Sequence, residues 1–221
     1  MTHLYRELRS VSPAGETCLV HRTLRACDLG TLIQRAEKAG KSLRNLDLHR
    51  ASLRGARLDG VGLRKVILSH ADLQEARLEA CSLPDATLQA ANLSGSVFRR
   101  CNLGGVKLSH AVLYGTVFDG CQMQNMVLRR TRVQNVSFHD CDGVIDGGAD
   151  YRGYRFFAVR HDHDTFIAAG CRWFSSREAK AHWFSPGYRR ARGPMGALTK
   201  ARVKLLLQQA EALGWPVKAL A

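Results

Sequence analysis

Residues 71–95 read ADLQEARLEACSLPDATLQAANLSG, and within this stretch a leucine returns at every fifth position. The pattern extends in both directions, from Leu48 to Phe138, over nineteen consecutive positions that are all large and apolar. Most of these positions follow, by two residues, a small or modestly apolar residue such as Ala71 or Cys81. Neither an α-helix nor an alternating strand has a period of five residues. The pattern therefore predicts a repeat architecture.

The repeat resembles the pentapeptide-repeat family, whose loose consensus A(D/N)LXX is matched by ADLQE at 71–75 and by ANLSG at 91–95. The resemblance covers residues 46–140. It implies a mainly β fold, a right-handed quadrilateral parallel β-helix in which each pentapeptide forms one side and four pentapeptides form one coil. The resemblance says very little about function.

Four cysteines recur at intervals of twenty residues, at Cys81, Cys101, Cys121 and Cys141. In the implied β-helix, residues one coil apart stack at about 4.8 Å, so the first three are predicted to form an inward-pointing column with Cys141 at its frayed end. A straight column cannot surround a metal ion tetrahedrally, although the spacing leaves oxidation open. We expect the thiols to pack as small apolar groups. The same arithmetic predicts a second column of Leu78, Phe98, Phe118 and Phe138.

The N-terminal part, residues 1–45, is predicted to hold a partial coil and a capping helix. Leu19, Leu24 and Leu29 follow the five-residue period. The helix-forming residues of Thr31–Lys41 then interrupt the period, and the helix is expected to stop at Gly40. The helix is expected to cover the first opening of the β-helix, because an uncovered end exposes strand edges.

The C-terminal part, residues 150–221, is predicted to be a small α+β domain that follows the β-helix of residues 46–142. The stretch 140–153 is rich in Gly and Asp and indicates a boundary. Two strands are expected at 154–161 and 165–174. A capping box of Ser175 and Glu178 predicts a helix through Trp183, and a last helix is expected over Thr199–Leu213. This domain would dock on the C-terminal opening or hang beside it.

The net charge of the 221 residues is +14, distributed as about +4 over residues 1–45, +4 over 46–140 and +6 over 141–221. Such a balance favours acidic partners, nucleic acid first among them. Seven cysteines without paired CxxC spacing do not suggest a disulfide framework. Because no run of eighteen apolar residues and no signal-like start occurs, we expect no membrane contact and a place in the cytoplasm of a bacterial host cell.

Two basic regions are candidates for binding a polyanion. In the first, one side of the β-helix would align Arg50, His70, Ala90, His110 and Arg130, with His49, Lys107 and Arg129 alongside and Asp47 as its only acid. The second region has no acid from 179 to 210 and contains Lys180, Arg189, Arg190, Arg192, Lys200, Arg202 and Lys204. Phosphate neutralisation would suit either region, whereas the alternative is that these cations only keep the surface soluble. A flat side has no element shaped to read bases in a groove.

Aromatic residues accompany the second region, namely Trp173, Trp183, Phe184 and Tyr188. They would form the core of the small domain or stack on bases. The run His161 to Asp164 is expected to be a solvated hairpin tip rather than a metal site, because its spacing matches no structural zinc pattern. No catalytic or nucleotide-binding fingerprint occurs, so we expect no enzyme activity and no cofactor.

The sequence therefore predicts a non-catalytic binding or scaffold protein that engages nucleic acid or an acidic host protein. Residues 169–183, AGCRWFSSREAKAHW, resemble a tail found in phage- and prophage-encoded pentapeptide-repeat proteins, which suggests a host-takeover or anti-defence role. One alternative is a modulator of a type II topoisomerase, since family members that confer quinolone resistance bind DNA gyrase by imitating the rod shape and negative charge of DNA. The charge of this chain has the opposite sign. A second alternative is a structural spacer or oligomer core in a phage assembly, joined through the β-helix ends or the C-terminal domain.

Overall fold

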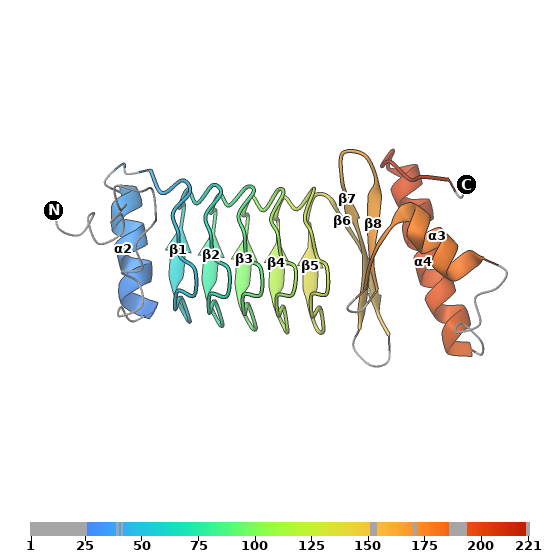
Figure 1. Ribbon diagram of the computed structural model, residues 1–221, viewed down its shortest axis with the longest axis horizontal. Coiled ribbons are helices and arrows are strands. Elements are labelled where there is room, and N and C mark those ends of the chain that lie inside the picture. The colour runs from blue at the N-terminus through green and yellow to red at the C-terminus, as the bar shows by residue number, and fades with distance from the viewer. Residues whose placement is uncertain are drawn as a thin grey trace.

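The computed structural model describes residues 26–38, 40, 42–150, 154–169, 172–185 and 194–219. Figure 1 shows one elongated arrangement: a helix, a row of stacked strands, a second sheet and a pair of helices. The elements in chain order are α2 (Ala26–Lys38), β1 (Arg57–Asp59), β2 (Arg77–Glu79), β3 (Val97–Arg99), β4 (Val117–Asp119), β5 (Ser137–His139), β6 (Val144–Ala149), β7 (Arg155–Arg160), β8 (Thr165–Ala169), β9 (Arg172–Ser175), α3 (Ser176–Phe184) and α4 (Pro194–Ala212).

The predicted quadrilateral parallel β-helix is confirmed. Strands β1 to β5 form one parallel sheet in chain order, and each residue pairs with the residue twenty positions later, as Leu78 does with Phe98. Isolated parallel bridges with the same offset join the three other sides of the coils, for instance Gly62 with Ser82. This register also stacks the cysteines, because the amide of Gln122 donates to Cys101 O at 3.0 Å in the same way as that of Asn102 donates to Cys81 O.

The interior of the β-helix is filled by the residues that carry the five-residue period. Every leucine of the run from Leu48 to Leu128 is at most 3% exposed. On the side of β3 to β5 the rings of Phe98, Phe118 and Phe138 stack, with centroids 5.2 and 5.5 Å apart. The stack continues beyond the β-helix, because Phe157 of β7 lies 4.8 Å from Phe138. The apolar core therefore runs from the coils into the second sheet.

Helix α2 covers the first opening of the β-helix, as predicted, but its bounds and the preceding partial coil differ from the prediction. The helix begins at Ala26 and ends at Lys38, so Leu29 is helical and does not belong to a coil. Leu19 and Leu24 lie outside the described residues. Ile33 is fully buried in the core of the β-helix. The Gln34 side chain donates to Asp59 O at 2.6 Å and accepts from Asp59 N at 3.0 Å, which pairs the exposed edge of β1.

The C-terminal domain docks on the other opening and does not hang beside it. Its sheet has the antiparallel order β6-β7-β8-β9. One face of the sheet, including Phe157, Val159 and Ala168, packs on the last coil. The opposite face, with Phe156 and Ile167, packs on α3 and α4, a placement that Figure 1 also shows.

Three predicted boundaries in this domain were wrong. The stretch 140–153 contains strand β6, which pairs with β7, so the sheet begins before residue 150. The single strand expected at 165–174 is two strands, β8 and β9, paired with each other. Helix α4 begins at Pro194 rather than Thr199. The predicted capping box is confirmed, since Ser175 N donates to Glu178 Oε2 at 2.7 Å and Glu178 N donates to Ser175 Oγ at 3.2 Å.

Candidate polyanion-binding surface

The structure aligns the five residues predicted to share one side of the β-helix. We call Arg50, His70, Ala90, His110 and Arg130 the basic column. In each of the first four, the backbone amide donates to the carbonyl of the residue that precedes the next member of the column, as His110 N does to Arg129 O. The N to O distances are 2.8 to 2.9 Å. All except the half-buried Ala90 are exposed. The column is thus held in register by the backbone and faces solvent.

The backbone of the column is left-handed, with φ between +55° and +62°. Each member is the third residue of a tight turn, which Arg50 illustrates: Ala51 N donates to Leu48 O at 2.9 Å across it. Positive φ at this position is typical of type II turns, where glycine or asparagine is usual. Here the corner carries arginine or histidine in four of the five coils. These four side chains are exposed at the corners.

Two further predicted cations lie beside the column. Lys107 is bridged to Thr87 and Val127 in the row next to it, and Arg129 precedes Arg130; both are exposed. Asp47, the acid of this side, is half-buried and accepts a hydrogen bond from His49 N at 2.9 Å. The His49 and His70 rings are in edge contact at 5.3 Å. The arginines and the lysine on this side are unevenly distributed along it. Arg50 stands alone at one end, and Lys107, Arg129 and Arg130 lie beyond Ala90 toward the other.

Four arginines on the other sides of the β-helix have acidic partners. Ion pairs join Arg54 to Glu75 at 2.9 Å, Arg64 to Asp85 at 4.0 Å, Arg99 to Asp119 at 3.6 Å and Arg100 to Glu79. In contrast, Arg50, Lys107 and Arg130 form no ion pair with any residue of the described ranges. Their charges are therefore available to an external anion.

The second basic region is only partly available. Lys180 pairs with Glu211 at 3.3 Å, and Arg202 donates to Gly147 O at 2.7 Å, so both cations serve contacts within the domain. Lys200 is half-buried and Lys204 is exposed. Arg189, Arg190 and Arg192 lie outside the described residues, as does Tyr188. Trp183 is 4% exposed in the domain core, whereas Phe184 is exposed.

A cavity of about 370 Å³ lies where the basic column meets the C-terminal domain. We call it the junction pocket. Arg129 and Arg130 line it from the β-helix, and Arg172 lines it from β9. Phe166, Trp173, Phe174 and Glu178 complete its lining. Neither the arginine of β9 nor the pocket was predicted, because the repeat period places residues only within the coils.

The carboxylate of Glu178 is already engaged at the edge of this pocket. Hydrogen bonds from the Ser175 backbone and then from its side chain lower the pKa of Glu178 below the usual value, and the charge of Arg129 lowers it further. This carboxylate therefore stays ionised, and one of its oxygens is committed to the start of α3.

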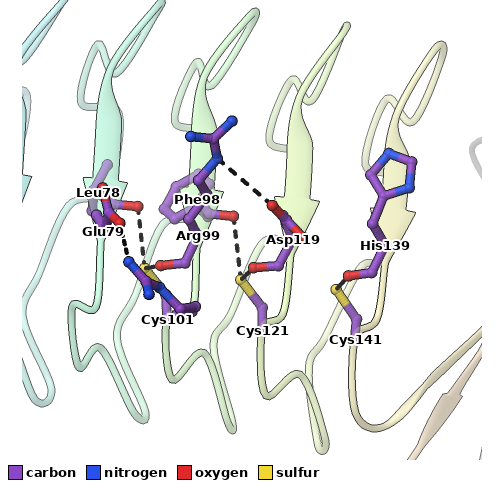
Figure 2. A network of polar contacts seen from close by, with 10 residues as sticks. Leu78, Glu79, Phe98, Arg99, Cys101, Asp119, Cys121, His139 and Cys141 are labelled. Carbon is purple, nitrogen blue, oxygen red and sulfur yellow. Dashed lines mark hydrogen bonds and ion pairs between the residues drawn. The ribbon is translucent and has the colours of Figure 1, made fainter.

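The cysteine column is part of the core of the β-helix. Cys81, Cys101 and Cys121 are buried with free thiols, and Cys141 at the end is half-buried, as predicted. In Figure 2 each drawn sulfur points to backbone carbonyls, and Cys101 Sγ lies 3.4 Å from Leu78 O and 3.3 Å from Arg99 O. Contacts with the Cys121 and Cys81 thiols, followed by burial, raise the pKa of Cys101. Such a thiol is a poor nucleophile at neutral pH.

The run His161 to Asp164 forms the hairpin tip between β7 and β8, as predicted, but only Asp162 and His163 are exposed. Asn125 at a corner of the β-helix exchanges two hydrogen bonds with Asp162, at 2.9 and 3.0 Å. His161 Nε2 lies 2.6 Å from Met126 O, and Asp164 is buried beside Ser176. Over the described ranges, no group of three or more His, Cys, Asp or Glu side chains is placed to hold a metal ion. The run instead fastens the second sheet to the last coil.

Acidification is expected to weaken this contact between the second sheet and the last coil. Burial lowers the pKa of His161, against smaller opposing effects of the Met126 carbonyl, Asp162 and Asp164. A histidine that is neutral when folded stabilises the protein above its unfolded pKa of about 6.5, and the contribution is lost as the pH falls through the lower folded value. The urea concentration at the midpoint of unfolding should therefore decrease when the pH is lowered from 7.5 to 5. The decrease should be smaller in His161→Gln, whose amide can still donate to Met126 O.

The matched control for this pH series is His163→Gln, which changes an exposed histidine of the same run. It should keep the full pH dependence of the urea midpoint. Identical pH dependence in His161→Gln and the unaltered protein would contradict the role given to His161.

The model of pentapeptide repeats matches eight copies, over residues 42–83, 71–109, 81–120 and 107–142. The comparison with curated proteins gave no significant match. Over the described residues, no helix is both long and apolar enough to cross a membrane.

Similar solved structures include a pentapeptide repeat protein from the Arabidopsis thaliana thylakoid lumen, with 20% identity, a TM-score of 0.36 and coverage of 45% of this chain and 72% of that one. QnrB1, a plasmid-mediated fluoroquinolone resistance protein, has 14% identity, a TM-score of 0.34 and coverage of 43% and 63%. HetL, a pentapeptide repeat protein involved in heterocyst differentiation regulation from the cyanobacterium Nostoc, has 25% identity, a TM-score of 0.29 and coverage of 46% and 55%.

Proposed function

We propose, from the premise that residues 42–142 of this chain belong to the pentapeptide-repeat family, that the protein is a non-catalytic binding protein that holds a polyanion, nucleic acid first, against its basic side. The basic side comprises the basic column with Lys107 and Arg129. The observation that carries the proposal is that Arg50, Lys107 and Arg130 are exposed on one side and have no ion-pair partner among the described residues. On the other sides, four arginines do have acidic partners.

A linear polyanion suits the shape of this side. From Arg50 to Arg130 the column rises over four coils, or about 19 Å at a strand spacing of about 4.8 Å. Lysines and arginines that neutralise phosphates release condensed counterions, a gain that does not depend on base sequence. A flat side contacts phosphates without entering a groove, so we expect binding that is weakly specific and strongly dependent on salt. An acidic protein surface is the second kind of partner that the basic side would bind.

The test is a charge reversal on the basic side. Arg50→Glu combined with Lys107→Glu removes two cations that do not line the junction pocket. We expect at least a tenfold loss of affinity for a single-stranded or duplex 30-mer at low salt, measured by fluorescence anisotropy. The slope of log K against log salt should fall by roughly one for each lost phosphate contact.

The matched control is Arg57→Glu combined with Arg77→Glu, which changes the net charge by the same amount on another side. Both residues are exposed, and each has an acid on its own strand, Asp59 or Glu79. This control should retain most of the affinity. Equal losses in the two variants would mean that only the net charge matters, and undiminished binding by the first variant would refute the proposal.

The two alternatives predicted from the sequence have less support. A net charge of +14 is the opposite of what a DNA-imitating topoisomerase modulator needs. A spacer built by stacking β-helices end to end needs open ends, whereas α2 covers the first coil and the β6–β9 sheet covers the last. Supercoiling by DNA gyrase that is inhibited or protected by the protein would revive the first alternative, and co-purification with virions would revive the second.

We place the protein in the cytoplasm of a bacterial host cell and assign it to a phage or prophage. The support is the resemblance of residues 169–183 to the tail of phage-linked family members. In the structure this segment contributes β9 and most of α3. A pull-down from host lysate, with and without nuclease, would separate a nucleic-acid partner from an acidic host protein.

A further inference from the structure

The junction pocket gathers positive charge at one end of the basic side. Arg129, Arg130 and Arg172 line a cavity of about 370 Å³ together with one acidic residue, Glu178. The excess is two positive charges, three less one. Cavities of roughly 300 to 1,000 Å³ are typical of small-molecule sites. The pocket is thus large enough for a small ligand and suited to a dianion.

The arginines come from two separate parts of the fold. Arg129 and Arg130 belong to the last complete coil, and Arg172 belongs to β9 of the docked sheet. A planar guanidinium binds phosphate through two parallel hydrogen bonds. Three such groups around one cavity can surround a phosphate monoester, which carries a charge of about −1.5 to −2 at neutral pH. A phosphodiester carries a single charge and would leave the pocket with an excess.

Aromatic rings line the rest of the pocket and are held in place by packing. Phe166 and Trp173 stack with centroids 5.3 Å apart and planes at 11°. Phe174 makes an edge contact with Trp183 at 4.7 Å. Phe166, Trp173 and Phe174 are all half-buried, so part of each ring faces the cavity. A nucleobase can stack on such rings whatever its sequence identity.

We propose that the junction pocket binds a nucleoside monophosphate unit, with the phosphate held by Arg129, Arg130 and Arg172 and the base packed against Trp173. The unit comes from one of two sources, a free nucleotide or the phosphorylated end of a single strand. The second source rests on the proposed function, since the strand would continue from the pocket onto the basic column. Binding of a free nucleotide does not depend on the proposed function.

The experiment titrates the full chain with five probes by calorimetry: adenosine monophosphate, adenosine, inorganic phosphate, a decamer with a 5′-phosphate and the same decamer without it. Adenosine monophosphate should bind at least tenfold more tightly than adenosine or inorganic phosphate alone, because only this probe contacts both the arginines and the aromatic rings of the pocket. If the strand end is the source, the phosphorylated decamer should also bind more tightly than the unphosphorylated one. Equal affinities for the two decamers, with binding of the mononucleotide, assign the pocket to the free nucleotide.

Two variants test the assignment of residues. Arg172→Gln, at an exposed position, and Trp173→Leu should each weaken binding of adenosine monophosphate by about tenfold or more. Arg177→Gln is the matched control, because Arg177 is an exposed arginine of the same domain that does not line this pocket. It should leave the affinity unchanged.

The outcomes separate this proposal from the proposed function. Absence of measurable binding of adenosine monophosphate, equal binding of adenosine, or unchanged binding in Arg172→Gln overturns the pocket proposal. Loss of 30-mer binding in the Arg50 and Lys107 variant, with adenosine monophosphate still bound, supports both proposals. If that variant binds the 30-mer undiminished while Arg172→Gln loses adenosine monophosphate, only the proposed function fails.

Discussion

Phe118→Ala is expected to destabilise the protein by about 3 to 5 kcal/mol, the range for truncating a buried phenylalanine. Phe118 is 1% exposed and stacks between Phe98 and Phe138 in the interior of the β-helix. The substitution removes both ring contacts and leaves a cavity in a coil whose neighbours cannot collapse, because the backbone hydrogen bonds fix the distance between coils. Urea unfolding followed by circular dichroism would measure the loss.

The matched variant for the phenylalanine stack is Phe118→Leu. Leu58 and Leu78 occupy the same position in the first two strands, so the coil accepts leucine there without a change of backbone. We expect this variant to lose less than about 1.5 kcal/mol. A loss below about 1 kcal/mol in Phe118→Ala would show that the stack contributes little, and that the hydrogen-bonded coils alone hold the β-helix together.

Gly143→Ala should cost about 2 to 4 kcal/mol, because two effects act at once. Gly143 has a φ of +81°, a region that residues with a Cβ enter at a cost of about 1 to 2 kcal/mol. A Cβ at this position would also lie 2.7 Å from Gln124 N and 2.9 Å from Gln124 Cα. Both are backbone atoms that cannot rotate away. Gly143 O accepts from Arg160 N at 2.9 Å, so the strain falls on the joint between the coils and the second sheet.

The control for this joint is Gly115→Ala, at a corner of the β-helix with a φ of +66° and no atom within 4 Å of the added Cβ. It should lose only about 1 kcal/mol, since only the backbone conformation is disfavoured. Asn125 and Arg130 already adopt this conformation at other corners. Thermal unfolding of both variants would compare them, and equal losses would contradict a steric role for Gly143.

The β-helix and its two internal columns were predictable because its contacts are periodic. Each residue meets the residue twenty positions away, so the position of Phe98 predicts that of Phe118, and Arg50 and Arg130 fall on one side by counting alone. The capping box of Ser175 and Glu178 was predictable for a related reason. It depends on two residues three positions apart, and no distant partner is needed.

The ends of the β-helix followed no such rule. The Gly- and Asp-rich stretch 140–153 was interpreted as a boundary, yet Val144–Ala149 becomes a strand because β7 offers it a partner. Arg202 appeared to be one cation of a basic run, but its guanidinium satisfies Gly147 O. In both cases the partner is far away in sequence, and local propensity does not identify it.

The amino-acid order alone thus established the coil, its register and the alignment of the cations on one side, because in a β-helix the distance between two residues in space follows from their separation in sequence. Docking of the second sheet decided which of those cations share a cavity with Arg172 and Trp173. It also decided that His161 is half-buried against Met126. These contacts depend on how the apolar face of an antiparallel sheet packs on the last coil, and packing between elements has no period from which it could be counted.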